Sequence, residues 1–186
     1  MQRYLPLLLI VGLLIAFRAI GSVFSDSMPN FQPLAAVFFC GALLAPGWRG
    51  FVIPLMVWAA TYPMGIGPVS DPAIFLTTLL GFAAVFFLGK GLTHKGLPTL
   101  LIGSGAAALV FHLITNSIAW IGDPLYAKNL TGLWQSLWAG PLGSPIPSWV
   151  FLRNMAVANI LFTAIFALAQ MRLPKFSASS APVLAK

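Results

Sequence analysis

Six long apolar stretches make up most of the chain, and they constrain its fold more than any other feature of the sequence. A helix needs about 20 residues to cross the hydrocarbon of a bilayer, with about 17 as the usual minimum. A buried helix of a soluble protein could explain one such stretch, but not six in 186 residues. The sequence therefore predicts an all-α, polytopic integral membrane protein with six transmembrane helices. The stretches are 4–24, 31–46, 51–65, 73–91, 97–121 and 148–171.

The scarcity of charge supports the same class of protein. Only 7% of the residues are charged, whereas a soluble domain carries about 25%. The basic residues are scattered singly at the ends of apolar stretches, which argues against binding to nucleic acid and is typical of membrane topology signals. We predict one six-helix transmembrane domain over 1–172 and a disordered cytoplasmic tail over 173–186.

Two of the stretches need interpretation. The second and third are short, and the sequence PGWRG at 46–50 permits only a tight turn, so we predict a hairpin of two short spans. The first stretch could instead be a cleaved signal peptide. Arg18, however, lies where a small-residue cleavage region should be, so we interpret this stretch as the first helix.

The charges predict the orientation. With six spans, seven of the ten basic residues fall on one side, and all three aspartates fall on the other. Loops rich in lysine and arginine remain on the cytoplasmic side of a membrane. Both termini are therefore expected on the cytoplasmic side of the bacterial inner membrane. The seven are Arg3, Arg49, Lys90, Lys95, Arg172, Lys175 and Lys186.

The longest outer connection, 122–147, contains apolar residues at helical spacing. This spacing predicts a short helix that lies in the membrane interface. The residues are Leu130, Leu133, Trp134, Leu137 and Trp138.

Polar residues gather in the outer halves of five of the six stretches, whereas the inner halves contain few. Buried polar groups in a membrane are costly and usually face the interior of the bundle. This asymmetry predicts a polar chamber that opens to the outside and binds a small molecule. The candidate ligand-binding residues are Arg18, Asn30, Gln32, Tyr62, His112, Asn116, Arg153 and Asn154.

Each of these residues also has a structural explanation. Arg18 could extend to the outer headgroups, and Arg153 could pair with an aspartate at the rim. His112 and Asn116, four residues apart on one helix face, could hydrogen-bond to neighbouring helices. Taken singly, the residues favour packing roles, whereas the cluster as a whole favours a cavity.

The residues offer little for catalysis. The chain has no glutamate, its three aspartates lie in separate connections, and no metal-binding motif occurs. We therefore expect no enzyme, no metal and no cofactor. The remaining expectation is binding of a solute, with Arg18 and Arg153 favouring an anionic or polar ligand.

Four stretches resemble known membrane proteins: PNFQPLAAVFFCGALL (29–44), FHLITNSIAW (111–120), YAKNLTGLWQSLWAGPL (126–142) and FLRNMAVANILFTAIFA (151–167). With six spans and about 190 residues, the chain resembles the substrate-binding S components of energy-coupling factor (ECF) transporters. The four stretches look more specifically like a family of uncharacterised small bacterial membrane proteins related to them.

The resemblance implies capture of a vitamin-like micronutrient from outside and its delivery to an ATP-driven energising module. S components dock that module through small residues of the first helix, which implies a docking role here for Gly12 and Ala16. One departure concerns cobalamin, which some related proteins bind through a cysteine in the third connection. Here that connection, MGIGPVSDP at 64–72, has no cysteine, so such binding is not expected.

The alternative function is a membrane scaffold or assembly subunit that transports nothing. Its polar cluster would hold the helices together, and its interfacial helix would contact a partner.

Overall fold

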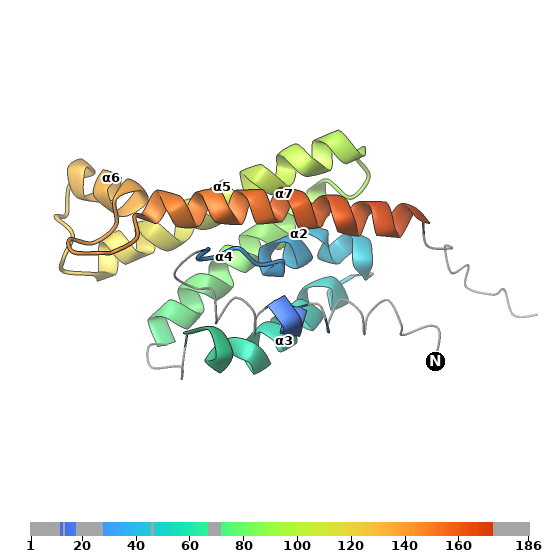
Figure 1. Cartoon of the computed structure of the whole chain (residues 1–186), viewed down its shortest axis with the longest axis horizontal. Helices are drawn as coiled ribbons and strands as arrows, with labels where there is room; N and C mark the ends of the chain where they lie inside the picture. The colour runs from blue at the N-terminus through green and yellow to red at the C-terminus, as the bar shows by residue number, and fades with distance from the viewer. Residues whose placement is uncertain (1–11, 13, 18–27, 46, 67–71, 173–186) are drawn as a thin grey trace, which may run out of the picture.

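The structure of the chain, a computed structural model, describes residues 12, 14–17, 28–45, 47–66 and 72–172. These residues are helical or lie in loops between helices, and none of them is in a strand, so the predicted all-α fold is confirmed for this part of the chain. Figure 1 labels the helices α2 Leu34–Leu44, α3 Arg49–Ile66, α4 Pro72–Gly91, α5 Leu97–Gly122, α6 Leu130–Trp138 and α7 Ser148–Arg172.

Three of these helices are long and apolar enough to cross a membrane. They are α4, α5 and the Ser148–Gln170 part of α7. They also expose large apolar side chains, such as Leu76, Phe87 and Ile102, as a helix surrounded by lipid does. Most of the predicted first span and all of the tail 173–186 lie outside the described residues. The structure thus supports a membrane protein but does not establish six spans.

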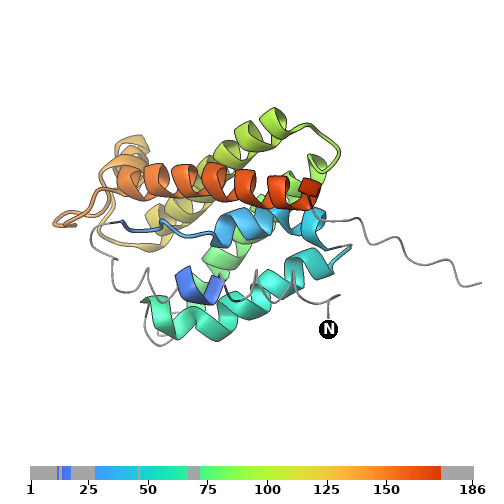
Figure 2. The same ribbon diagram turned by 45° about the vertical axis from the view of Figure 1, so that its right-hand side comes forward.

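Helix α2 is short because prolines precede it. Pro33 is its N-cap, and Asn30 adopts a positive φ of 60°, so residues 28–33 are irregular where a span from residue 31 was predicted. The eight residues from Leu34 to Gly41 are all buried, and Figure 2 shows α2 between α7 and α3. A helix of 11 residues is about 16 Å long, roughly half the hydrocarbon thickness. This helix therefore lies in the core of the bundle, and its helical part alone is shorter than the hydrocarbon thickness.

Glycines allow α2 to approach its neighbours closely. A Cβ atom on Gly41 would lie 2.1 Å from the carbonyl oxygen of Gly50 in α3. A Cβ atom on Gly89 of α4 would lie 1.8 Å from the carbonyl oxygen of Phe39 in α2. Such backbone contact is typical of membrane helices that pack through small residues. As predicted, α2 and α3 are separate helices joined by a tight turn.

Aromatic rings fill the space around α2. Phe38 of α2 stacks on Phe82 of α4 with ring centroids 4.5 Å apart. Phe82 also contacts Phe111 of α5 at 5.0 Å and Trp58 of α3 at 5.4 Å. Offset and edge-to-face pairs of this kind stabilise a core beyond the area they bury. Four helices are therefore joined by one aromatic cluster.

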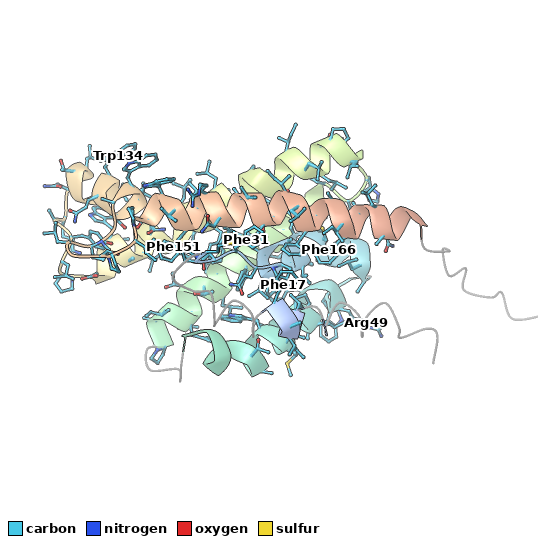
Figure 3. All side chains as sticks on the ribbon, viewed as in Figure 1. Phe17, Phe31, Arg49, Trp134, Phe151 and Phe166 are labelled. Carbon is cyan, nitrogen blue, oxygen red and sulfur yellow. The ribbon has the colours of Figure 1, made fainter. Side chains whose placement is uncertain are left out.

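The exposed basic residues Arg49 and Lys90 lie at the opposite end of the molecule from α6. Figure 3 labels Arg49 at one end and Trp134 of α6 at the other. Lys90, near the end of α4, lies at the Arg49 end, whereas Asp123 follows α5 at the α6 end. The helix α6 forms where the sequence predicted it, and its position in a membrane interface stays a prediction.

Candidate functional site

A cavity of about 260 Å³ lies at the α6 end of the bundle. Its walls come from the irregular segment 28–33, from α5, from the connection before and after α6, and from the first turns of α7. Three of the predicted ligand-binding residues, Asn30, His112 and Asn116, line it. The complete lining is Asn30, Phe111, His112, Thr115, Asn116, Tyr126, Pro141, Ser148, Phe151, Leu152 and Met155.

The His112 imidazole joins α5 to α6. Its Nε2 lies 2.8 Å from the carbonyl oxygen of Leu137, which can only accept, so Nε2 carries the proton and donates. Its Nδ1 lies 3.1 Å from Nδ2 of Asn116, which donates to it. Both ring nitrogens are therefore hydrogen-bonded, and the imidazole is in its neutral form with the proton on Nε2. His112 forms part of the cavity wall.

The short helix α6 is held against α5 by further hydrogen bonds. The hydroxyl of Ser136 donates to the carbonyl oxygen of Asn116 at 2.7 Å. At the start of α6, the Asn129 side chain accepts from the backbone N–H of Gly132 and caps the helix. The small polar face of α6 is thus packed inward. Its outward face is apolar, with Leu130 83%, Trp134 64% and Trp138 52% exposed.

Lys128 secures the connection between the two helices. Its ammonium donates to the carbonyl oxygens of Trp120 and Asp123, at the C-terminal end of α5. Carbonyl groups there have no partner within the helix, so a lysine near that end satisfies them. The connection between α5 and α6 is therefore held to the end of α5 by hydrogen bonds.

Sequence reasoning missed three polar residues of the cavity: Thr115, Tyr126 and Ser148. Tyr126 is buried and is hydrogen-bonded to Ser136. Burial raises the pKa of the Tyr126 phenol, so it stays protonated at neutral pH. Tyr126 and Ser148 lie outside the predicted spans or at their edge, where polar residues are ordinary. Only the helical spacing of Thr115 from His112 could have indicated its face.

Three polar groups in the cavity have no hydrogen bond within the described part of the chain: the side-chain amide of Asn30, the side-chain oxygen of Asn116 and the hydroxyl of Ser148. Together they offer donors and acceptors to a bound molecule. Among the residues that the structure describes, no Lys, Arg, Asp or Glu side chain lines the cavity.

Three other predicted residues that the structure describes, Gln32, Arg153 and Asn154, do not line this cavity. Arg153 is exposed, and its guanidinium lies 5.2 Å from the ring centroid of Trp149. Its Nε donates to Oδ1 of Asn154 at 3.1 Å, and Asn154 donates to the carbonyl oxygen of Pro29 at 3.0 Å. These two residues therefore attach the irregular segment to α7. Gln32 is half-buried outside the cavity lining.

Other predicted residues are described only in part. Arg18 lies outside the described residues, and so does the side chain of Tyr62 in α3. Gly12 and Ala16 are helical and exposed, and a Cβ atom on Gly12 would meet no atom within 4 Å. Their predicted role in docking stays a prediction.

A second polar cluster lies deeper between α2, α5 and α7, and the sequence analysis did not anticipate it. Asn159 donates from Nδ2 to the carbonyl oxygen of Ser104 at 3.2 Å, and its Oδ1 is buried with no partner. The thiol of Cys40 lies 3.7 Å from the hydroxyl of Thr163. All four side chains are fully buried. Polarity is therefore less confined to the outer half than the sequence suggested.

The part of the chain that the structure describes is all-helical, with three helices long and apolar enough for a membrane and with a polar-walled cavity at one end. The family model that matches residues 1–180 is described as "Family of unknown function (DUF6580)". The chain belongs to this family. No curated protein matches the chain, and no solved structure does.

Proposed function

We propose that this protein is a non-enzymatic solute-binding protein of the bacterial inner membrane. It has six spans, its termini are cytoplasmic, and its α6 end faces outward. It captures a small, vitamin-like micronutrient for uptake, as the S components that it resembles do. The observation that supports this proposal best is the cavity beneath α6.

The non-helical backbone beside the cavity supports the proposal that the cavity contains water. Residues 28–33 are not helical, and their carbonyl groups lie beside the first turns of α7, where Asn154 contacts Pro29. Non-helical backbone at membrane depth is tolerated only where it is buried in protein or lines a water-filled space. His112 lies ten residues before the end of α5, about 15 Å along its axis. The cavity therefore reaches well below the outer end of α5.

The cavity walls favour an uncharged ligand. Arg153 faces away from the cavity, so the anionic ligand that the sequence suggested has no described cation to pair with there. The unpaired groups of Asn30, Asn116 and Ser148 can instead donate and accept hydrogen bonds, while Phe111 and Phe151 supply apolar surface. The volume equals that of roughly eight or nine water molecules in the liquid. We therefore propose a compact neutral solute with both polar and apolar faces.

Uptake also needs energy. We propose that an ATP-driven module docks on the exposed small residues Gly12 and Ala16, as the resemblance to S components implies. The protein would then supply the binding site and the module would supply the work.

A scaffold role is the second candidate, and the hydrogen bonds of His112 favour it. Both ring nitrogens bind the protein's own groups, and Ser136 completes the attachment of α6. In a scaffold, the polar cluster would serve only to hold the helices together through these hydrogen bonds.

Thermal shifts of the detergent-purified protein against a panel of neutral and charged vitamins distinguish the two functions. For a binder, one neutral solute raises the melting temperature. Asn30→Gly, which retains the positive φ of residue 30, and Ser148→Ala each weaken its binding about fivefold, because each loses about one hydrogen bond, while the unliganded melting temperature changes little. The matched control is Ser144→Ala, whose hydroxyl binds Ile146 outside the cavity lining. A scaffold would respond to no solute in the panel.

A further inference from the structure

An apolar groove of about 270 Å³ lies at the other end of the molecule, between the start of α3 and the end of α4. Aromatic side chains form it: Phe51 and Phe86 contact each other at 5.3 Å, and Phe86 contacts Phe87 at 5.7 Å. Trp48 is 71% exposed and Phe87 is 65% exposed. The groove is lined by Gly47, Trp48, Phe51, Ala83, Phe86, Phe87 and Lys90.

Positive charge lies at the mouth of this groove. Lys90 is part of the lining, and Arg49 directly follows Trp48; both are exposed, and neither forms an ion pair within the described residues. The helix α3 begins at Arg49, so its N-terminal dipole adds partial positive charge at the same place. The only acidic residue that the structure describes, Asp123, lies at the opposite end.

Exposed aromatic surface next to unpaired cations matches one kind of molecule in a membrane. An acyl chain fits the apolar groove, and an anionic headgroup pairs with the cations at its mouth. Basic pockets between transmembrane helices on the cytoplasmic side bind anionic lipid headgroups in this way, and Trp is enriched at that depth. A neutral lipid would fill the groove equally well but would leave Lys90 and Arg49 without a partner.

We propose that the groove between α3 and α4 is a selective site for an anionic phospholipid of the cytoplasmic leaflet, with Lys90 and Arg49 binding its phosphate group. The site rests on the membrane placement proposed above but is independent of the solute in the outer cavity. Docked lipid would cover the aromatic face and tie the first turn of α3 to the last turn of α4.

Fluorescence quenching by brominated lipids tests the site directly. The full chain in detergent micelles is titrated with phosphatidylglycerol or with phosphatidylcholine, both carrying the same brominated acyl chains. The Trp48 contribution is isolated by comparison with Trp48→Phe. We expect phosphatidylglycerol to quench Trp48 at several-fold lower concentration than phosphatidylcholine. Arg49→Gln and Lys90→Gln should each weaken phosphatidylglycerol binding about fivefold, because each cation near a membrane surface contributes attraction of that size.

The matched control is Lys95→Gln, an exposed lysine at the same end that does not line the groove. It should leave the preference for phosphatidylglycerol intact. Equal quenching by the two lipids would overturn the proposal. A preference for phosphatidylglycerol that survives in the Arg49→Gln/Lys90→Gln double variant would also overturn it, and so would a preference that Lys95→Gln abolishes to the same extent.

Three results distinguish the lipid site from the proposed membrane placement and from the proposed solute binding. If neither lipid quenches Trp48, a protein segment covers the groove or the end lies outside the bilayer, and the lipid site is rejected. Quenching by both lipids without preference would reject the site and retain the membrane placement. Failure of every solute to shift the melting temperature would reject the solute proposal and leave this one unaffected.

Discussion

His112 and Asn116 show how one pair of polar residues can serve both the fold and the site. Both side chains line the cavity, and both are hydrogen-bonded within the protein. The pair attaches α6, and the side-chain oxygen of Asn116 has no hydrogen bond within the described residues. The proposed binding would depend on the groups that the fold leaves unpaired, whereas fold stability depends on those it pairs.

The first prediction concerns His112→Ala. This change leaves the Leu137 carbonyl without its side-chain donor, while the Asn116 amide keeps only its bond to the backbone carbonyl oxygen of residue 112. A lost buried hydrogen-bond partner costs about 1–3 kcal/mol. The melting temperature of the unliganded protein should fall in a thermal unfolding assay. The control is Leu113→Ala, an exposed neighbour on the same helix, which should change it little. An unchanged melting temperature in His112→Ala would show that α6 is not held by this bond.

The second prediction concerns Asn159→Leu. The Oδ1 atom of Asn159 is buried without a donor, and leucine has the same number of side-chain heavy atoms and no polar atom to satisfy. We expect this variant to be about as stable as the wild type, because removal of the unpaired oxygen offsets the lost bond from Nδ2 to the carbonyl oxygen of Ser104. Asn159→Asp should be less stable, since it places a charge there. A large loss of stability in Asn159→Leu would mean that a water or another donor normally binds this oxygen.

At the scale of the element, the central helix α2 determines how the bundle packs. Its neighbours reach it through glycines, so the helix axes can approach to backbone contact. The short length of α2 also creates the irregular segment before it, and that segment forms one wall of the cavity. Helix packing and site formation are therefore linked through the same 11-residue helix.

The third prediction concerns Gly89→Ala. The added methyl group would lie 1.8 Å from the carbonyl oxygen of Phe39, so α4 must move away from α2. Overpacking of this kind costs about 1–3 kcal/mol or more, and the melting temperature should fall. The control is Gly91→Ala in the same helix, where the methyl group would meet no atom within 4 Å. Equal stability of the two variants would contradict the close contact of α2 and α4.

Sequence alone could predict some of these elements because their signals are local. The helices α4, α5 and α7 follow from uninterrupted hydropathy, and α6 follows from its helical spacing of Leu and Trp. Hydropathy could not show that α2 is central, because a helix facing lipid and a helix buried in protein are equally apolar. Pro33 was the local signal for its late start.

The candidate site was less predictable than the helices. Asn30, His112 and Asn116 stood out because polar residues are rare in apolar stretches. Tyr126 and Ser148 did not, since their burial depends on how the connection folds back over α5. Arg153 stood out for its charge, yet it lies over Trp149 outside the cavity lining. A charge near the end of a helix indicates depth in the membrane, but not the direction in which the side chain points.

At the scale of the whole molecule, the two ends have different chemistry. The α6 end carries stacked tryptophans, with the rings of Trp134 and Trp138 6.0 Å apart, above a polar cavity. The opposite end carries Arg49 and Lys90 beside an apolar groove. This difference between the two ends is consistent with the two proposals, in which a solute binds on one side of the membrane and an anionic lipid binds on the other.

Cysteine accessibility tests whether the space beneath α6 is open to a small solute. Ser148 lines the cavity, whereas Ser104 lies in the core, and the native Cys40 is buried. A small, uncharged thiol reagent should label Ser148→Cys much faster than Ser104→Cys, with the wild type as background, and a bound solute should protect Ser148→Cys. Labelling of Ser148→Cys as slow as that of Ser104→Cys would contradict an open cavity, and the uptake function would then lose its support.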